Sequence, residues 1–491
     1  MATSSLSLNL GIDFGTQYTK VCVRDTDRGQ SWVVIPGKPA ARIEGSLIVS
    51  QVGIHSNGHL VAGLTQPEWN QYLAAHPNLL IIDFIKMRLA HLDPGREASN
   101  WYSSVLPTVQ GINLSTPEAL ENLCAFFLCQ VIKRSKDWIY LHDADLLKGV
   151  DVDWSAIVGV PVEYCDSPAL VRFKRVLCSA WHLSVHNIEG VTLPELNQYL
   201  NRLRSNFDTS RMQCFTLPEI AAAVYSYTFS RQARQGTYIF FDIGGGTMEG
   251  AAFKFHRNNA DEQPQIDFLA GLVEPVGVNA LAKQVACGST NLERQVESLI
   301  IRKGPTILSK IALLSEHYKK YFERLERGDV IANKHKIPVR LVKASLKPEK
   351  PDLYVTQILI LAQALIHRQV ATVIRMCARK LPKEEMRQIV VFLGGGGMLS
   401  SYYVDTIDAT YEAFNLRSTA MPRYRMRRIP VPDDFSMSGL DGKHFHRFSI
   451  AYGLSIPDYD APEFQLPNQI SNISPLPVGP RWVPETAHDD G

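Results

Sequence analysis

The chain contains none of the cysteine pairs that build disulfide frameworks or zinc sites. Its 491 residues include no Cys-x-x-Cys motif. The eight cysteines are scattered instead, at Cys22, Cys124, Cys129, Cys165, Cys178, Cys214, Cys287 and Cys377. This spacing argues against a disulfide scaffold and a zinc module, and it is typical of the reduced thiols of the cytosol.

Long hydrophobic runs and an excess of one charge are also missing. No apolar stretch approaches the ~18 residues that cross a bilayer, and the first residues lack the basic and apolar regions of a secretory signal. Basic and acidic residues number 51 and 49, for a formal net charge of +2. We therefore expect a soluble cytoplasmic protein of two or three domains, with neither a membrane nor a nucleic acid as partner.

Two short segments share one pattern, Leu10–Thr16 and Phe241–Thr247. Each follows an apolar run, places an aspartate at the end of an expected strand (Asp13 and Asp242), and turns through glycine to a threonine. Glycine has no Cβ, so backbone N–H groups in such a turn can surround a phosphate. A carboxylate beside them can hold a water of a hard divalent cation. The pair predicts a nucleotide clamped between two related lobes.

A third glycine run follows a strand near the end of the chain, where Gln388–Leu393 leads directly into Gly394–Gly397. Strands, helices and glycine turns recur in both halves, and this alternation predicts an α/β fold. The apolar spacing also predicts long helices at Pro117–Trp138 and Asp352–Arg379. We place the first lobe at residues 1–235 and the second lobe at residues 236–456.

Residues 457–491 differ in composition from the rest. Seven prolines punctuate this segment, at Pro457, Pro462, Pro467, Pro475, Pro477, Pro480 and Pro484. Such density predicts an extended tail that folding and ligand binding do not need. Its apolar residues leave open whether it docks on its own protein or on a partner, and they are Phe464, Leu466, Ile470, Ile473 and Trp482.

The motifs together resemble the actin-like ATPase superfamily, and within it the nucleotide-binding domain of the seventy-kilodalton heat-shock chaperones. Gly11–Tyr18 is similar to the first phosphate motif, Phe241–Thr247 to the second, and Val391–Gly397 to the adenosine motif. The resemblance covers about residues 8–456. It implies a two-lobed fold of duplicated ribonuclease H-like domains with helical insertions, whose last helix, around Ile450–Gly453, returns to the first lobe.

The same resemblance implies a site for ATP or ADP with Mg²⁺. Asp13 and Asp242 would hold the metal ion through water. The residues implied in hydrolysis are Asp13, Lys86, Asp242, Thr247 and Glu219. The residues implied in binding the nucleotide are Gly15, Thr16, Gln17, Tyr18, Gly244, Gly245, Gly246, Glu316, Lys319, Lys320, Gly394, Gly395 and Gly396.

Four features depart from the family pattern. Leu217 stands where the family has an acidic residue, so only Glu219 could replace it, from a shifted position. Glu249 replaces an aspartate, and the adenosine motif has a fourth glycine. No β-sandwich substrate domain follows Tyr452, so we expect the peptide-clamping module to be missing.

The function we expect is that of a slowly ATP-hydrolysing, chaperone-like conformational switch acting on a protein partner. Three alternatives remain open at this point. They are an actin-like filament-forming ATPase, a phosphotransferase or exopolyphosphatase, and a nucleotide-binding pseudoenzyme.

Overall fold

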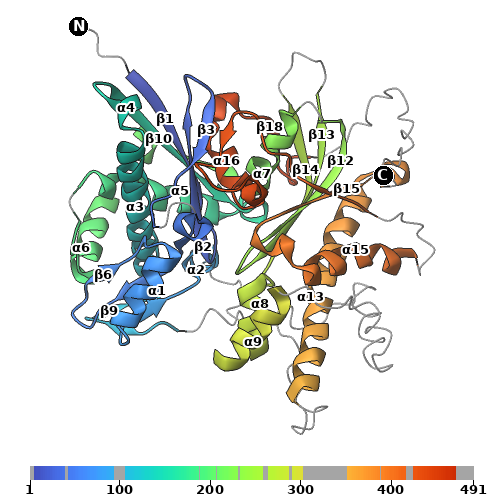
Figure 1. Cartoon of the computed structure of the whole chain (residues 1–491), viewed down its shortest axis with the longest axis horizontal. Coiled ribbons are helices and arrows are strands. Elements are labelled where there is room, and N and C mark those ends of the chain that lie inside the picture. Colours follow the sequence, from blue (N-terminus) through green and yellow to red (C-terminus); the bar gives the residue numbers. More distant parts are fainter. Residues whose placement is uncertain are drawn as a thin grey trace.

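The computed structural model describes most of the chain as a mixed α/β structure (Figure 1). The described residues are 5–38, 42–92, 105–186, 188–205, 207–230, 233–257, 264–286, 290–301, 351–386, 389–415 and 424–470. Among them, no helix has the length and apolar character needed to cross a membrane.

The first large sheet is built around β1 (Ser5–Asp13). β1 pairs in parallel with β10 (Asp151–Val160) and antiparallel with β2 (Tyr18–Asp25), as expected for a strand that turns back through glycine. The order in the described chain is β11-β10-β1-β2-β3-β17, with β4 also paired to β2. The remaining strands are β11 (Cys214–Pro218), β3 (Gln30–Val33), β17 (Phe435–Ser436) and β4 (Ile48–Val49).

The second large sheet repeats this arrangement around β12 (Gly236–Ile243). β12 pairs in parallel with β15 (Val390–Gly394) and antiparallel with β13 (Met248–His256). Its order is β16-β15-β12-β13-β14-β18. The other strands are β16 (Arg425–Arg428), β14 (Gln265–Glu274) and β18 (Glu463–Gln465). The first two glycine turns therefore occupy the same place in both sheets, between the central strand and its antiparallel neighbour.

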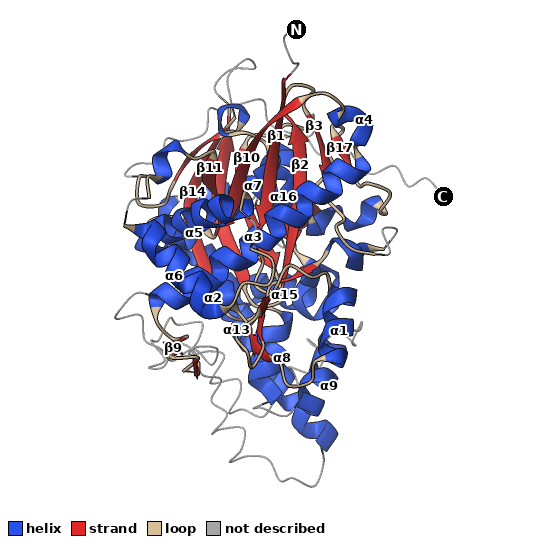
Figure 2. Ribbon diagram, turned by 90° about the vertical axis from the view of Figure 1, so that its left-hand side faces the viewer, coloured by secondary structure: helices blue, strands red, loops and turns tan. Residues whose placement is uncertain are grey.

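Helices of the first half cover the outer face of the first sheet, which faces the viewer in Figure 2. α3 (Pro117–His142) contains the predicted helix 117–138; it starts at Pro117, and the side chain of the N-cap residue Thr116 accepts a hydrogen bond from Ala119 N. Its buried face packs with α5 (Pro168–Ser184). Smaller elements complete this half: α1 (Gln66–Ala75), α2 (Ile85–Ala90), α4 (Ala144–Leu147), α6 (Leu193–Arg204), β5 (Val52–Ile54), β6 (Leu60–Val61), β7 (Leu80–Ile82), β8 (Thr108–Val109) and β9 (Ile112–Asn113).

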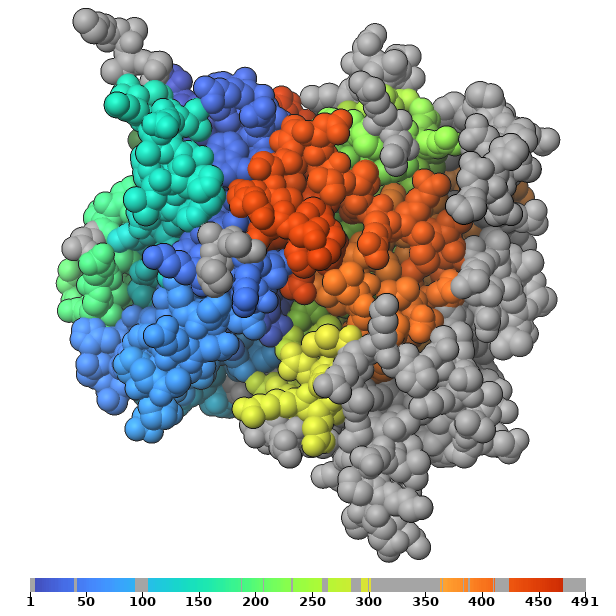
Figure 3. Space-filling model, viewed as in Figure 1, coloured from blue at the N-terminus to red at the C-terminus, as the bar shows by residue number. Residues whose placement is uncertain are grey.

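Two fully buried helices, α7 (Glu219–Thr228) and α16 (Ser449–Ser455), fill the space between the sheets (Figure 1). They approach so closely that a Cβ on Gly453 would overlap the carbonyl oxygen of Ala222. α16 follows the last strands of the chain yet packs on β1, where Asn9 Nδ2 donates hydrogen bonds to its C-terminal carbonyls. The segment around α16 thus lies between the two halves (Figure 3).

The second half has its own core beneath its sheet. α13 (Pro351–Lys380) contains the predicted helix 352–379 and packs on β13 and β14. The other described helices of this half are α8 (Val278–Ala286), α9 (Thr290–Ile301), α14 (Lys383–Met386) and α15 (Ser401–Asn415).

The predicted extended tail begins inside the fold. β18 pairs in parallel with the edge of β14, and Phe464 packs against the core between the sheets. Leu466 packs on the first core, and Lys380 Nζ donates to Pro467 O at 3.1 Å. The stretch 463–470 therefore docks on its own protein, which is one of the two alternatives that the sequence left open for the tail. Residues 471–491 lie outside the described residues.

Ending the chain after residue 458 should therefore destabilise the protein, whereas ending it after Ile470 should not. The shorter form loses β18 and the packing of Phe464, which contribute about 2 kcal/mol to the free energy of unfolding. Urea denaturation of both forms beside the full chain measures this difference. Equal stability of the two truncated forms would mean that docking of residues 463–470 contributes nothing to the fold.

Candidate functional site

A cleft of about 370 Å³ opens where the glycine turns of the two sheets meet. Its walls come from the ends of β1 and β12, the exit of β15, α2, and the starts of α7 and α8. Most of the predicted site residues line it: Asp13, Gly15, Thr16, Gln17, Tyr18, Lys86, Glu219, Asp242, Gly244, Gly245, Thr247, Gly395 and Gly396. Residues more than 380 positions apart in the sequence are thus gathered in one site.

Among the described residues, two of the predicted ones do not line the cleft, Gly246 and Gly394. Gly246 lies where the first two turns touch, and a Cβ there would overlap the side chain of Thr16. Gly394 ends β15 against the ring of Phe240. The predicted adenosine contacts Glu316, Lys319 and Lys320 lie outside the described residues.

The second glycine turn is fixed by hydrogen bonds to the start of α8. The carbonyl of Gly244 accepts from Val278 N at 3.1 Å, and that of Gly245 accepts from Asn279 N at 2.7 Å. The carbonyl of Gly246 accepts from Gly277 N at 3.2 Å. In a planar trans peptide, the carbonyl of one residue and the N–H of the next residue point in opposite directions. Because these three carbonyls point toward α8, the N–H groups that follow them point away from α8. Successive amides with a common direction form a binding site for an anion.

Behind the turns lies a buried ion pair. Lys86 on α2 donates a close hydrogen bond to Glu219, the first residue of α7, and both side chains are buried. Burial favours the neutral amine, but the carboxylates of Glu219 and Asp13 outweigh it and raise the pKa of Lys86. The lysine is therefore held as a cation. Glu219, which we expected to take part in hydrolysis, thus contacts Lys86, the other such residue from outside the glycine turns.

Asp13 has a cation partner of its own. Lys20 lies directly opposite Asp13 in the β1–β2 register, and the two side chains form a close ion pair. Sequence analysis missed Lys20, although counting residues across the turn would have placed it there. Both side chains line the cleft.

Two further carboxylates lie beside this cluster, the half-buried Asp242 and the buried Glu249. Burial raises the pKa of Asp242 to about 7; the Lys20 ammonium opposes this shift, and the Asp13 carboxylate adds to it. Burial also raises the pKa of Glu249 well above its usual range, and Glu219 adds to that shift. Glu249 Oε1 accepts from Val162 N at 2.7 Å, so Glu249, on β13, is bonded to the segment that follows β10 in the first sheet.

Asp13 and Asp242 suit a metal ion that a bound ligand also coordinates. They suit an ion held by protein atoms alone less well. Asp13 and Asp242 end the two central strands and reach the same cleft. Among the described residues, no group of three or more His, Cys, Asp or Glu side chains could enclose a metal ion. Mg²⁺ keeps several waters and is usually bound by one or two carboxylates together with phosphates. The donor set therefore fits the expected ion in combination with a phosphorylated ligand.

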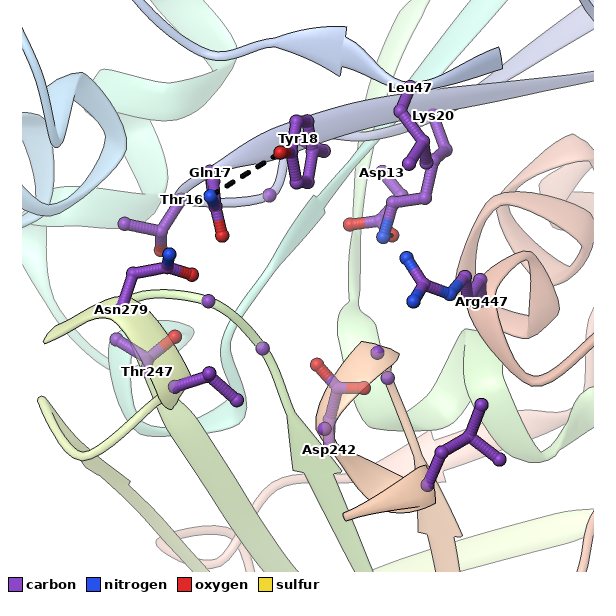
Figure 4. Close-up of a pocket in the computed structure, with 18 of the residues that line it drawn as sticks. Asp13, Thr16, Gln17, Tyr18, Lys20, Leu47, Asp242, Thr247, Asn279 and Arg447 are labelled. Atoms are coloured by element: carbon purple, nitrogen blue, oxygen red, sulfur yellow. Dashed lines mark hydrogen bonds and ion pairs between the residues drawn. The ribbon is translucent and has the colours of Figure 1, made fainter. Parts of the chain in front are cut away.

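The cleft also contains residues that sequence analysis did not identify. They include Lys20, Glu44, Leu47, Asn279, Glu297, Ser400 and Arg447. Arg447 comes from the segment before α16 and projects toward the cleft from the side opposite Thr16 and Asn279 (Figure 4). Arg447 belongs to no recognisable sequence motif, because its place in the cleft depends on how the chain returns between the two sheets.

No protein-family model matches the chain, and no curated protein matches it. The functional argument therefore depends on the geometry of the cleft.

Proposed function

We propose that this protein is a nucleotide-dependent conformational switch that binds ATP or ADP between its two sheets and hydrolyses ATP slowly. One observation carries the proposal. Two sheets with the same strand order each deliver an aspartate and a glycine turn to the same cleft. This repetition supports a two-lobed actin-like ATPase fold, similar to the nucleotide-binding domain of the seventy-kilodalton heat-shock chaperones. As in those proteins, the switch would act on a protein partner.

The chemistry assigned to the cleft is binding and orientation of a triphosphate. The turn amides bind phosphate oxygens, because fixed N–H dipoles stabilise the charge that phosphoryl transfer redistributes. Lys86, kept protonated by Glu219, donates to the attacking water or to the γ-phosphate, with Thr247 on the opposite turn. A bound Mg²⁺, held by Asp13 and Asp242 through water, would neutralise charge on the phosphates.

The position of Glu219 favours hydrolysis over the pseudoenzyme alternative. Although Leu217 replaces the acidic residue of the family pattern, the carboxylate of Glu219 still reaches Lys86. The cleft therefore retains a buried acid beside its lysine. Phosphate release from ATP by the purified chain tests this point, and binding without turnover would favour the pseudoenzyme.

Mg-ATP and Mg-ADP should stabilise the folded protein. At a hundred times its dissociation constant, a ligand adds about 2.7 kcal/mol to the free energy of unfolding. Thermal melts with 5 mM Mg-ADP, 5 mM Mg-ATP and 5 mM MgCl₂ alone measure the effect, because about 5 mM is a hundred times a dissociation constant of about 50 μM. A melting temperature that neither nucleotide raises above the MgCl₂ control would remove the basis of the proposal.

A further inference from the structure

Arg447 is positioned by the third glycine turn. It ends the short 3-10 helix Gly442–Arg447, directly before α16. The neighbouring carbonyl of His446 accepts from Gly395 N at 3.1 Å, which attaches this segment to the turn after β15. Arg447 is thus fixed to the second sheet at Gly395 while α16, which follows it, packs on the first sheet.

The guanidinium lies face-on against Gly396. A Cβ built on Gly396 would be 3.4 Å from Cζ and 3.5 Å from each Nη of Arg447. Three nearly equal distances mean that the guanidinium plane, rather than its edge, faces the glycine. The N–H groups lie around the edge of the guanidinium, so they do not point at Gly396. Arg447 lines the cleft, where these groups can meet a ligand.

This cation lacks a direct partner among the described residues. None of them forms an ion pair or a hydrogen bond with its guanidinium, and its Nε atom is buried without an acceptor. Burial lowers the pKa of Arg447, and the more distant Tyr18 and Glu44 partly offset this shift. A half-buried charge without hydrogen bonds is unfavourable, so the site is suited to an anion supplied by a ligand.

We propose that Arg447 binds a phosphate group of the nucleotide and holds it against the third glycine turn. This inference rests on the proposed function, because it takes the ligand of the cleft to be a nucleotide. Phosphate is the group that suits the residue, since the planar fork of arginine donates two parallel hydrogen bonds to phosphate oxygens. Even a Cβ at position 396 would only meet the guanidinium at van der Waals distance, so the turn leaves the arginine room beside it.

Binding of a series of ligands to the full chain tests the assignment. Adenosine, AMP and ADP are titrated by calorimetry, in MgCl₂, into the wild type, Arg447→Met and Arg447→Lys. Arg447→Met should weaken AMP and ADP by at least about tenfold and leave adenosine unchanged, because charged hydrogen bonds to the phosphate are lost. Arg447→Lys, which keeps the charge but loses the fork, should give an intermediate loss. Arg211→Met, at a side chain that is 87% exposed, is the matched control.

Three results would overturn the proposal. Equal weakening of adenosine would place Arg447 on the nucleoside, unchanged affinities would remove it from ligand binding, and a loss in the Arg211→Met control would make the effect nonspecific. Should Arg447→Met fail to melt cooperatively, the lysine variant carries the same comparison.

Pyrophosphate separates this inference from the proposed function. If pyrophosphate raises the melting temperature of the wild type and not of Arg447→Met, Arg447 binds phosphate even where no nucleotide binds. If the wild type and Arg447→Met bind nucleotides equally well, the proposed role of Arg447 is refuted. The proposed function is unaffected by that result. If neither nucleotide nor pyrophosphate binds, both fail.

Discussion

Replacing Lys86 with methionine should lower the free energy of unfolding by about 3 to 5 kcal/mol. The substitution leaves Glu219 buried without its cation, close to the carboxylates of Asp13 and Glu249. The cost of an unpaired buried charge accounts for most of this loss, since methionine fills a similar volume. Urea denaturation followed by circular dichroism measures the change.

The double variant separates the ion pair from packing. Removing both charges, with Lys86→Met and Glu219→Leu together, should recover part of the stability that the single variant loses. Lys443→Met, at a side chain that is 68% exposed, should change stability by less than about 0.5 kcal/mol. If Lys86→Met behaved like this exposed control, the pair would be unimportant for the fold. ATP turnover by any folded Lys86 variant then tests the assigned role in hydrolysis.

The parts of the site that could be predicted from sequence are those that local structure fixes. A strand, an aspartate and a glycine turn lie within a few residues of each other, so Asp13 and Asp242 could be assigned from the motifs alone. Lys86 and Glu219 are further apart in the sequence and meet only because α2 and α7 converge. The family resemblance suggested each as a candidate, and the packing of the two helices shows that they form a pair.

Other features depend on contacts that no local pattern encodes. Leu217 is buried in β11, and the carboxylate that reaches Lys86 comes from Glu219 at the start of α7, two residues later. The apolar residues around β18 left open where the tail docks, and Phe464 and Leu466 pack on surfaces formed by distant elements of the same chain. Arg447 depends on the same long-range return of the chain. The tertiary structure therefore determines which weak sequence signals matter.

A methyl group at position 277 should disable the second glycine turn. Gly277 joins β14 to α8, and a Cβ there would lie 2.6 Å from Gly246 C, 2.6 Å from Thr247 N and 2.7 Å from Gly244 O. All three atoms belong to the backbone, so no side-chain rotation relieves the overlap. The turn itself must move, which would disturb the carbonyl contacts with α8 and the direction of the amides.

Gly277→Ala should consequently lower the free energy of unfolding by about 3 kcal/mol, the upper end of the usual range for overpacking. It should also reduce ADP affinity by at least about tenfold, which corresponds to about 1.4 kcal/mol of binding free energy. Gly442→Ala is the matched control, because a Cβ at Gly442 meets no atom within 4 Å. Denaturation and calorimetric titration of both variants measure the two effects separately. A stable Gly277→Ala protein with wild-type ADP affinity would show that the turn's amides do not bind the ligand in this conformation. Loss of affinity in a variant that still melts cooperatively would instead link nucleotide binding to the backbone of the turn, because alanine at position 277 adds no charge and removes no polar group.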